Sequence, residues 1–315
     1  MALTLYHAPA SFFSQRARFA LAEKNVKYKS VYVEIHGEEH YEPWYVRINP
    51  LMTVPSLVVK DGSKFIDSEA IITFVDQITP ELPPLFPDEK TPEGQKCQHF
   101  LDLIRTVKIE QITMGTLRNP EFTQDFKSPV GPNSFEKSVN AGLAKVKRYS
   151  EKYEDLRYEY LNKITALKQH LDSVKDDGGL RTSLDVVEDV LSQIEADLGK
   201  AAADQRDVPE EVRPWLCGQW LCVADIYLAT LLHRLALVGY SHLWTAGRRP
   251  SLEQYYQRVL WRDSFRQSCL HANNLFWSYK VPLLVYKAKL AMPWVIGASA
   301  LAAVAAGVYI YIRKQ

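Results

Sequence analysis

A long uncharged apolar run near the C-terminus constrains the organisation of this chain most. Residues 294–312 read WVIGASALAAVAAGVYIYI and contain no charged side chain, and Arg313 and Lys314 follow directly. At about 1.5 Å of rise per residue, a helix over this run spans about 28 Å, close to the hydrocarbon thickness of a bilayer. We therefore expect a transmembrane anchor over residues 293–312, with the bulk of the protein facing the cytosol.

The alternative for this run is a core helix of a soluble domain. Core helices of this length usually carry at least one charge, whereas this run is charge-free and rich in alanine and glycine. Trp294, Tyr309 and Tyr311 stand near its two ends, where aromatic rings favour the membrane interface. Because only three residues follow the run, we expect it to insert after translation, as a tail anchor.

Composition argues against several classes of function. The 315 residues carry a net charge of +1, and no basic stretch is interleaved with aromatic residues, which argues against nucleic acid as a partner. The N-terminal segment lacks a charged region followed by an apolar core, so no signal peptide is expected. The cysteines have neither CxxC spacing nor histidines at metal-ligand spacing, so we expect them to stay reduced and to hold no metal. They are Cys97, Cys217, Cys222 and Cys269.

The N-terminal quarter of the chain alternates short apolar runs with amphipathic segments, which predicts one α/β domain over residues 1–79. A tight turn at Asp61-Gly62 joins two of the runs and predicts a hairpin. The expected order is β-α-β-α-β-β-α. The predicted strands are 3–6, 28–35, 56–59 and 64–66, and the predicted helices are 14–24, 44–48 and 68–77.

A proline-rich segment marks the end of this domain. Five prolines fall within residues 79–92, which predicts a stiff linker over 80–92. The segments that follow read as helices, so we expect an all-α domain over 93–280. Its first helix is predicted at 95–117, and the polar, proline-broken stretch 119–140 is predicted to be a mobile loop.

Residues 151–200 have the pattern of a charged helical hairpin. Apolar residues recur at spacings of three and four over 153–174 and again over 184–198, and Asp-Asp-Gly-Gly separates the two stretches. Two interpretations stay open. The two stripes pack on each other, or the projecting hairpin offers a docking surface to a partner protein. Loop and hairpin together form an insertion over 119–200.

Four short motifs, met in order along the chain, resemble cytosolic glutathione transferases. Residues 11–18, SFFSQRAR, resemble the strand-to-helix turn in which the family places its thiol-activating hydroxyl. The resemblance implies Ser11 or Ser14 as the catalytic group. A hydroxyl at a helix N-terminus lies in positive potential and can donate to a thiolate, which is the chemistry required. Residues 216–218 and 224–226 resemble the capping segment of the family's core helix.

The two remaining motifs imply a glutathione site. Val54-Pro55 resembles the turn whose proline has a cis peptide bond, and extended backbone there can pair with a peptide-like ligand. Asp67-Ser68 resembles the pair that grips the glutamyl end of glutathione, because Ser68 can donate to a carboxylate and Asp67 can accept from an amine. The alternative for the serines of both sites is helix capping alone. The resemblance implies a thioredoxin-like N-terminal domain and an all-α C-terminal domain.

The chain departs from the family's pattern at two motif positions. Met52 stands where the family usually has glycine, so methionine is strained if the backbone there needs a positive φ. Cys222 stands where the capping box usually begins with serine or threonine, and a thiol is a weaker acceptor than a hydroxyl.

The tail, the insertion and several short segments match a divergent, membrane-anchored branch of the family. The segments are LLHRL at 231–235, RP and YYQRVL within 249–260, and Asn273-Asn274. This resemblance implies anchoring in the mitochondrial outer membrane, with the peroxisomal membrane as a second location. It also implies a role in mitochondrial fission, network shape and redox balance.

Two alternative functions stay open beside that one. The first is an active glutathione transferase that conjugates glutathione to an electrophile. The second is a binder of apolar ligands in the cleft between the two domains. Glutathione is the expected ligand or substrate of the transferase-like site, and no bound cofactor is expected. The expected partners are the membrane, proteins docking on residues 151–200, and a second copy of the chain.

Overall fold

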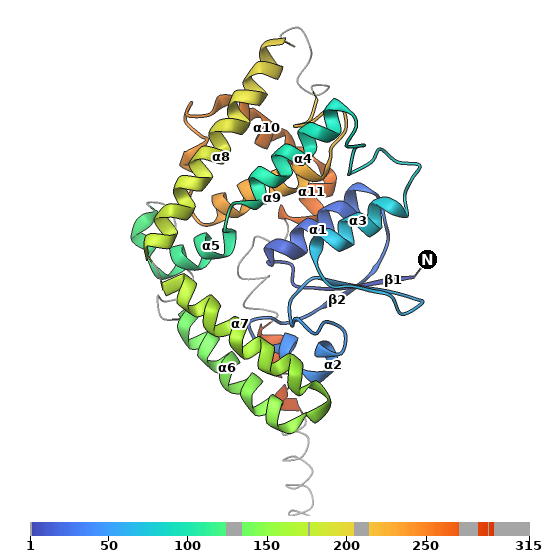
Figure 1. Ribbon diagram of the computed structural model, residues 1–315, viewed down its shortest axis with the longest axis vertical. Coiled ribbons are helices and arrows are strands. Elements are labelled where there is room, and N and C mark those ends of the chain that lie inside the picture. The colour runs from blue at the N-terminus through green and yellow to red at the C-terminus, as the bar shows by residue number, and fades with distance from the viewer. Residues whose placement is uncertain are drawn as a thin grey trace, which may run out of the picture.

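The computed structural model of the chain describes residues 2–123, 134–175, 177–204, 214–270, 283–288 and 290–292. A sheet with its helices occupies one side of the molecule, and longer helices occupy the rest (Figure 1). This arrangement confirms the expected thioredoxin-like N-terminal domain followed by a helical domain.

The sheet has four strands in the order β2-β1-β3-β4. β1 pairs in parallel with β2 and antiparallel with β3, and β3 pairs antiparallel with β4. Three strands lie within one residue of the predicted ranges, β2 ends three residues earlier than predicted, and the expected order of elements is confirmed. Their bounds are β1 (Leu3–His7), β2 (Lys29–Tyr32), β3 (Ser56–Val59) and β4 (Lys64–Phe65).

Three helices accompany the sheet: α1 (Phe12–Glu23), α2 (Pro43–Val46) and α3 (Ser68–Gln77). A single 3-10 turn, η1 (Glu39–Tyr41), precedes α2. Helices α1 and α3 lie together on one side of the sheet, and α2 lies on the other (Figure 1). Burial of apolar side chains between the sheet and helices α1 and α3 supplies the driving force for this packing. The side chains are Leu3, Leu5, Ala17, Leu21, Leu57, Val59, Ile71 and Val75.

The second domain is built around α9 (Val223–Leu237), which is buried along almost its whole length and confirms the predicted core helix. Helices α4 (Pro92–Arg105), α5 (Ile109–Arg118), α10 (Pro250–Trp261) and α11 (Asp263–Ser268) pack around it or beside it.

The predicted single helix over 95–117 is wrong, because the chain breaks between α4 and α5. The Thr106 hydroxyl donates to the carbonyl oxygen of Leu103 at 2.7 Å, and the backbone N–H of Thr106 turns to the same carbonyl at 3.2 Å. Val107 follows and is also β-branched. Side-chain bonding back to the helix and a stiff β-branched pair both oppose continuation of the helix.

The insertion contains three helices: α6 (Ser134–Lys152), α7 (Arg157–Lys175) and α8 (Asp177–Asp204). The expected pairing of the two apolar stripes on each other is wrong. Helix α7 packs chiefly on α6, whereas α8 packs on α5 and α10 at the other end of the molecule (Figure 1). The predicted loop over 119–140 is also wrong for residues 134–140, which belong to α6.

Different hydrophobic clusters account for this arrangement. The stripe of α7 joins α6 and the N-terminal domain in one cluster, which contains Tyr41, Met52, Val139, Val146, Tyr160 and Leu167. The stripe of α8 joins the main core around α9 instead, through Leu180, Val187, Val190, Leu191 and Ile194. Each stripe therefore buries its apolar area against a separate partner.

Residues 283–288 are helical and lie against the N-terminal domain. The ring of Tyr286 lies so close to Gly37 that a Cβ on this glycine would come within 2.4 Å of it, and Tyr286 is only 9% exposed. In the parts of the chain that the structure describes, no helix is both long enough and apolar enough to cross a bilayer. The expected anchor over 293–312 lies outside the described residues.

Candidate functional site

The sheet topology gathers the expected glutathione-site motifs at one end of the N-terminal domain. Tyr6 on β1 pairs with Ser56 on β3, and Leu57 on β3 pairs with Phe65 on β4. The end of β1, the start of β3 and the end of β4 therefore share one edge of the sheet. The turns that carry Ser11, Val54-Pro55 and Asp67-Ser68 all leave from that edge.

Asn49 ties two of these turns together. Its side-chain amide donates to the carbonyl oxygen of Thr53 at 2.8 Å, to the hydroxyl of Ser56 at 3.0 Å and to the carbonyl oxygen of Ile66 at 3.4 Å. The residue is fully buried, so these bonds are not exchanged with water. Asn49 was not predicted as a site residue. Its place directly before Pro50 is the only local signal, and that signal indicates the end of a helix rather than a buried amide.

Val54-Pro55 has the geometry that the resemblance implies. The peptide bond between the two residues is cis. Val54 is buried in a small cluster with Ala8, Val33 and Tyr45, which fixes the turn from the sheet side. A role for Val54 and Pro55 in binding glutathione stays a prediction.

Met52 adopts the backbone conformation that favours glycine. Its φ is 54°, and its side chain is 1% exposed. A side chain in this region costs about 1–2 kcal/mol relative to glycine. The expected strain at Met52 is therefore present, and burial of the methionine side chain offsets it.

Asp67, rather than Ser68, caps helix α3. The Asp67 carboxylate accepts the backbone N–H of Ala70 at 2.8 Å, and Ser68 is the first helical residue, 6% exposed. Glu69 then links this helix start to the second domain, because it accepts from Arg105 at 2.5 Å and from the hydroxyl of Tyr227 at 3.0 Å. The capping alternative for Ser68 is therefore wrong, because Asp67 is the cap, and a glutathione-binding role for the pair stays a prediction.

The two candidate catalytic serines differ in accessibility. Ser11 is the N-cap of α1, and its hydroxyl accepts the backbone N–H of Ser14 at 3.4 Å. Ser14 is fully buried, and its hydroxyl has no hydrogen-bond partner among the described residues. A thiolate that approaches from solvent would therefore contact Ser11 rather than Ser14. Catalysis by either residue stays a prediction.

Two arginines approach the start of α1, and neither was predicted as a site residue from the sequence. Arg16 is buried with its guanidinium 3.7 Å from the ring centroid of Tyr227, and its Nε donates to Thr230. Arg234 on α9 donates to the carbonyl oxygen of Ala10 at 2.7 Å. Burial lowers the pKa of each to about 10, and both remain cationic at neutral pH. The β1–α1 turn thus lies beside two fixed positive charges.

The α6–α7 hairpin is bonded to the loop that leads to Val54-Pro55. On α7, the Lys163 ammonium donates to the carbonyl oxygens of Leu51 at 3.0 Å and Met52 at 3.2 Å. Burial lowers the pKa of Lys163 to about 8. The hydroxyl of Tyr160 donates to the carbonyl oxygen of Tyr41 at 2.9 Å.

Helix α6 contributes a second set of bonds to the same domain. Lys145 pairs with Glu42 at 2.8 Å and donates to the carbonyl oxygen of Glu38 at 2.9 Å. The Tyr149 hydroxyl donates to the Glu42 carboxylate at 3.0 Å. The hairpin is therefore fastened to residues 38–52, at the edge of the sheet where the site motifs meet.

Comparison with known proteins assigns the chain to a family. The family model of the glutathione S-transferase N-terminal domain matches residues 5–83, and that of the C-terminal domain matches residues 179–258. Ganglioside-induced differentiation-associated protein 1-like 1 from Homo sapiens is 30% identical, over 99% of this chain and 87% of the relative. This chain belongs to the ganglioside-induced differentiation-associated protein 1 family of glutathione-transferase-like proteins.

Solved glutathione transferases share the fold of this family member. Glutathione transferase F7 from Populus trichocarpa superposes with a TM-score of 0.57 at 17% identity, over 84% of this chain and 97% of that one. A glutathione S-transferase from Methylobacillus flagellatus, solved with glutathione bound, gives 0.52 at 20% identity, over 85% and 98% of the two chains. The glutathione transferase fold expected from the four motifs is confirmed.

The two matched domain regions leave the middle of the chain unmatched. They end at residue 83 and resume at residue 179. Helices α6 and α7 lie between these limits. The hairpin that is bonded over the site edge thus lies outside both family models.

A cluster of three cysteines was not predicted from the sequence. Cys97, Cys217 and Cys222 are all buried, and their sulfur atoms lie within 4.8 Å of one another. Hydrogen bonds from the thiols of Cys217 and Cys222 lower the pKa of Cys97, whereas hydrogen bonding to Cys97 and burial raise the pKa values of Cys217 and Cys222. Spacing along the chain gave no sign that Cys97 would join the other two, because α4 and the start of α9 meet only in the folded domain.

Proposed function

We propose that this protein is a tail-anchored, glutathione-transferase-like protein of the mitochondrial outer membrane that acts by binding rather than by turnover. In this proposal it regulates mitochondrial fission and network shape, and it couples them to redox balance through a retained glutathione site. The family membership supports the proposal, and the hairpin bonded over the site edge is the observation that carries it.

The hairpin supports binding over turnover because it fixes the loop on which the site depends. Many enzymes need loops around the site to move so that ligands enter and leave. Here Lys163 holds the carbonyl groups of Leu51 and Met52, and Tyr160 holds that of Tyr41. The burial of the Ser14 hydroxyl and the strained backbone at Met52 also favour binding over turnover.

The outward face of α7 supplies a contact surface for a partner protein in this proposal. Tyr158 is 73% exposed and Leu161 is 48% exposed on that helix. Apolar side chains on an exposed helix face are the anchors that a second helix uses for docking. The expected docking role of residues 151–200 thus narrows to the α7 half, because the apolar stripe of α8 is buried in the main core.

Glutathione retention and turnover, measured on the same purified protein, test the proposal. We expect the full chain in detergent to be retained on immobilised glutathione and to give no conjugation of an electrophilic test substrate above the uncatalysed rate. Ser68→Ala should reduce retention. Robust conjugation that Ser11→Ala abolishes would contradict binding without turnover.

The second candidate function is an active glutathione transferase. The observation that favours it is the shared sheet edge, which gathers Ser11, Val54-Pro55 and Asp67-Ser68. A related fold from Methylobacillus flagellatus holds glutathione. The conjugation measurement above separates this function from the first one.

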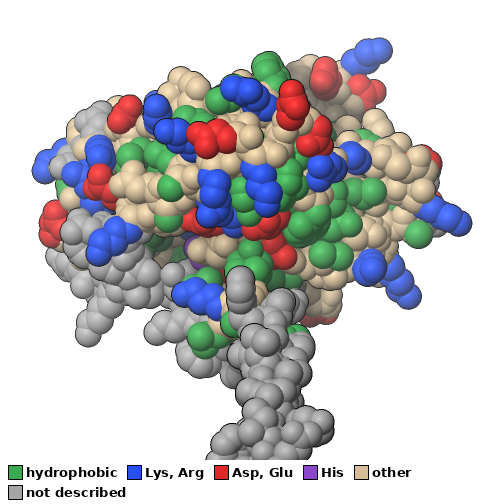
Figure 2. All heavy atoms as spheres, turned by 90° about the horizontal axis from the view of Figure 1, so that it is seen from below, with side chains coloured by type: hydrophobic (Ala, Val, Ile, Leu, Met, Phe, Trp, Pro, Cys, Tyr) green, Lys and Arg blue, Asp and Glu red, His purple; other side chains and the backbone are tan. Residues whose placement is uncertain are grey.

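The anchor over residues 293–312 is part of the proposal. The described residues just before it present exposed apolar side chains, as a segment near the membrane interface would: Leu284, Val285, Leu290 and Met292. Figure 2 shows that the surrounding face mixes positive, negative and hydrophobic side chains, so apolar contact rather than net charge would hold it at a membrane.

Deletion and a single charge test the anchor separately. We expect removal of residues 293–315 to release a folded protein from mitochondrial membranes into the carbonate-soluble fraction. Ala303→Lys should weaken insertion, because a lysine at mid-membrane costs about 3 kcal/mol on insertion scales. A truncated protein that stays in the membrane pellet would show that the anchor lies elsewhere.

A further inference from the structure

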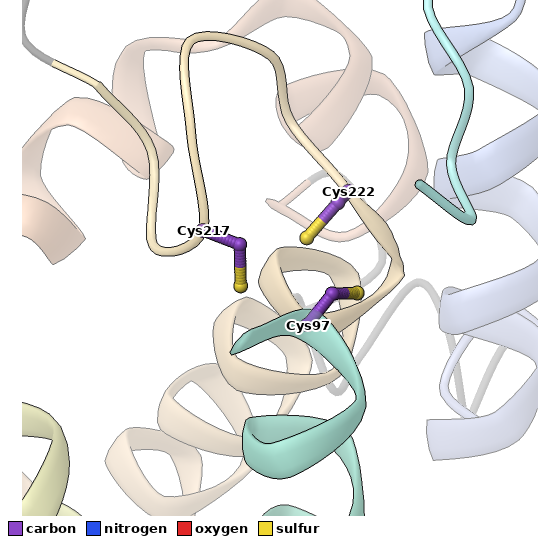
Figure 3. Close-up of side chains that lie close together, drawn as sticks. All are labelled: Cys97, Cys217 and Cys222. Atoms are coloured by element: carbon purple, nitrogen blue, oxygen red, sulfur yellow. The ribbon is translucent and has the colours of Figure 1, made fainter. Parts of the chain in front are cut away.

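Three cysteines from separate segments converge inside the helical domain. Cys97 comes from α4, Cys217 from the loop before α9, and Cys222 from the N-terminal cap of α9 (Figure 3). Every pair of sulfur atoms lies within 4.8 Å, and the three residues are 4%, 5% and 2% exposed. The proposed function does not use this cluster.

A single buried carboxylate positions two of the three cysteines. Asp225 accepts the backbone N–H of Leu216 at 2.9 Å and that of Cys222 at 2.9 Å. It also accepts the hydroxyl of Tyr255 at 2.8 Å. These bonds fix the residue before Cys217 and the backbone of Cys222 to one group. The sulfur positions are thus set by the fold before any ligand binds.

The start of α9 also provides electrostatic support for anionic sulfur. The sulfur of Cys222 accepts the backbone N–H of Asp225 in the capping box. The backbone N–H of Ala224 is hydrogen-bonded to Cys97. Unpaired N–H groups and the positive end of the dipole at a helix N-terminus stabilise negative charge. Two of the three sulfur atoms therefore accept hydrogen bonds from N–H groups at the start of α9.

The cluster has the composition of a site for a soft metal. Thiolate-only sites select Cu(I), zinc or iron–sulfur clusters. Structural zinc sites have four protein ligands, whereas the metal-ligating group found among the described residues contains only the three cysteines. Both oxygens of Asp225 are already hydrogen-bonded, Oδ1 to Leu216 and Tyr255 and Oδ2 to Cys222.

We propose that Cys97, Cys217 and Cys222 form a three-sulfur site for one soft monovalent metal cation of the Cu(I) class. A metal–sulfur bond of about 2.3 Å, the length found for zinc, places three sulfurs of a trigonal plane about 4.0 Å apart, within the observed limit of 4.8 Å. Binding displaces the thiol protons to solvent and changes no oxidation state.

Competition for Cu(I) under anaerobic, reducing conditions tests this site in the full chain. The probe is Cu(I) presented by a chromophoric chelator, and the expected result is withdrawal of one equivalent by the wild-type protein. Cys97→Ser, Cys217→Ser and Cys222→Ser should each weaken affinity at least about tenfold, because loss of a residue that merely orients a metal ligand already costs about that much. Cys222→Ser keeps a capping oxygen on α9, so this variant should fold.

Cys269→Ser is the matched control, because Cys269 is equally buried in the same domain but belongs to no such group. It should still take up one equivalent of Cu(I). Equal uptake by Cys97→Ser and Cys269→Ser would overturn the proposal. So would preference for zinc over Cu(I), or a disulfide within the cluster together with no Cu(I) uptake by the reduced protein.

Discussion

The ammonium of Lys163 donates a 3.2 Å hydrogen bond to the carbonyl oxygen of Met52. This contact joins the inserted hairpin to the residue whose φ of 54° marks the departure from the family's glycine. The insertion and the turn before Val54-Pro55 therefore form one packed unit. A change in the hairpin can reach the edge of the sheet where the candidate site motifs meet through this unit.

Removal of the Lys163 ammonium should loosen the loop beneath it. Lys163→Met keeps the aliphatic stem and deletes two hydrogen bonds from a charged group, each worth about 1.5–3 kcal/mol, while it also removes the cost of burying the ammonium. We expect a net loss of about 1–2 kcal/mol in the free energy of unfolding and faster amide exchange at residues 51–53. Lys168→Met, at an exposed position of the same helix, should change neither. Unaltered exchange in Lys163→Met would show that the contact does not hold the loop.

Glycine at position 52 should not stabilise the protein, although the family carries glycine there. Relief of the positive φ gains about 1–2 kcal/mol, whereas truncation of a buried methionine costs about 2–5 kcal/mol. We expect both Met52→Gly and Met52→Ala to lower the free energy of unfolding, with Met52→Ala lower by about 1 kcal/mol. Chemical denaturation of the three proteins measures this order. A Met52→Gly protein more stable than wild type would mean that strain outweighs packing.

Glutathione affinity should depend on Ser68 more than on Ser14. Ser68 lies at the start of α3, on the site edge, and loss of a hydrogen bond to a carboxylate costs about 1.5–3 kcal/mol. Ser14 is fully buried, so Ser14→Ala should leave affinity within about twofold. Calorimetric titration of both variants checks the ranking. Equal affinities for wild type and Ser68→Ala would remove Ser68 from the site.

Acid should destabilise the fold through His7. Burial, aided by the charge of Arg18, lowers the pKa of His7 to about 3 from 6.5. Below pH 6.5 the unfolded chain binds a proton at His7 and the folded protein does not. The free energy of unfolding is therefore unaffected by His7 above pH 6.5 and decreases as the pH falls toward 3. At pH 4.5 the loss is about 2–3 kcal/mol.

Comparison with two variants isolates this effect. His7→Gln should show a smaller fall in the free energy of unfolding between pH 6.5 and 4.5 than wild type. His242→Gln, at an exposed histidine, should follow the wild-type curve. Identical pH slopes for wild type and His7→Gln would assign the acid sensitivity to other groups.

Local patterns predicted the N-terminal domain well because its elements are short and bounded by strong signals. The alternation in the strands, the Asp61-Gly62 turn and the proline after Asn49 each act within a few residues. The four motifs also predicted the fold, because they occur in the same order as in the family. The buried partners Arg16 and Arg234 escaped notice, because nothing local distinguishes a buried arginine from an exposed one.

The helical insertion was predicted less well, because helical periodicity does not identify the element on which a helix packs. The stripes of α7 and α8 have the same spacing, yet one packs on α6 and the other on α5 and α10. The α4–α5 break depends on the hydroxyl of Thr106, which donates to the carbonyl oxygen of Leu103 in the preceding turn. The cysteine cluster depends on contact between α4 and α9, which no spacing rule covers.

The central claim is that the protein shapes the mitochondrial network by binding, without turnover at its serines. Replacement of residues 151–200 by a linker is not a clean test, because the stripe of α8 belongs to the main core. Tyr158→Ser with Leu161→Ser changes only exposed side chains of α7. Cooperative thermal unfolding of each variant provides the check on folding.

The most direct measurement is mitochondrial network length in cells that lack the protein and receive one of three full-length forms. The account predicts that Ser11→Ala with Ser14→Ala restores the wild-type network, whereas Tyr158→Ser with Leu161→Ser does not. Restoration by the α7 variant together with failure of the double serine variant would contradict the account and favour an anchored enzyme.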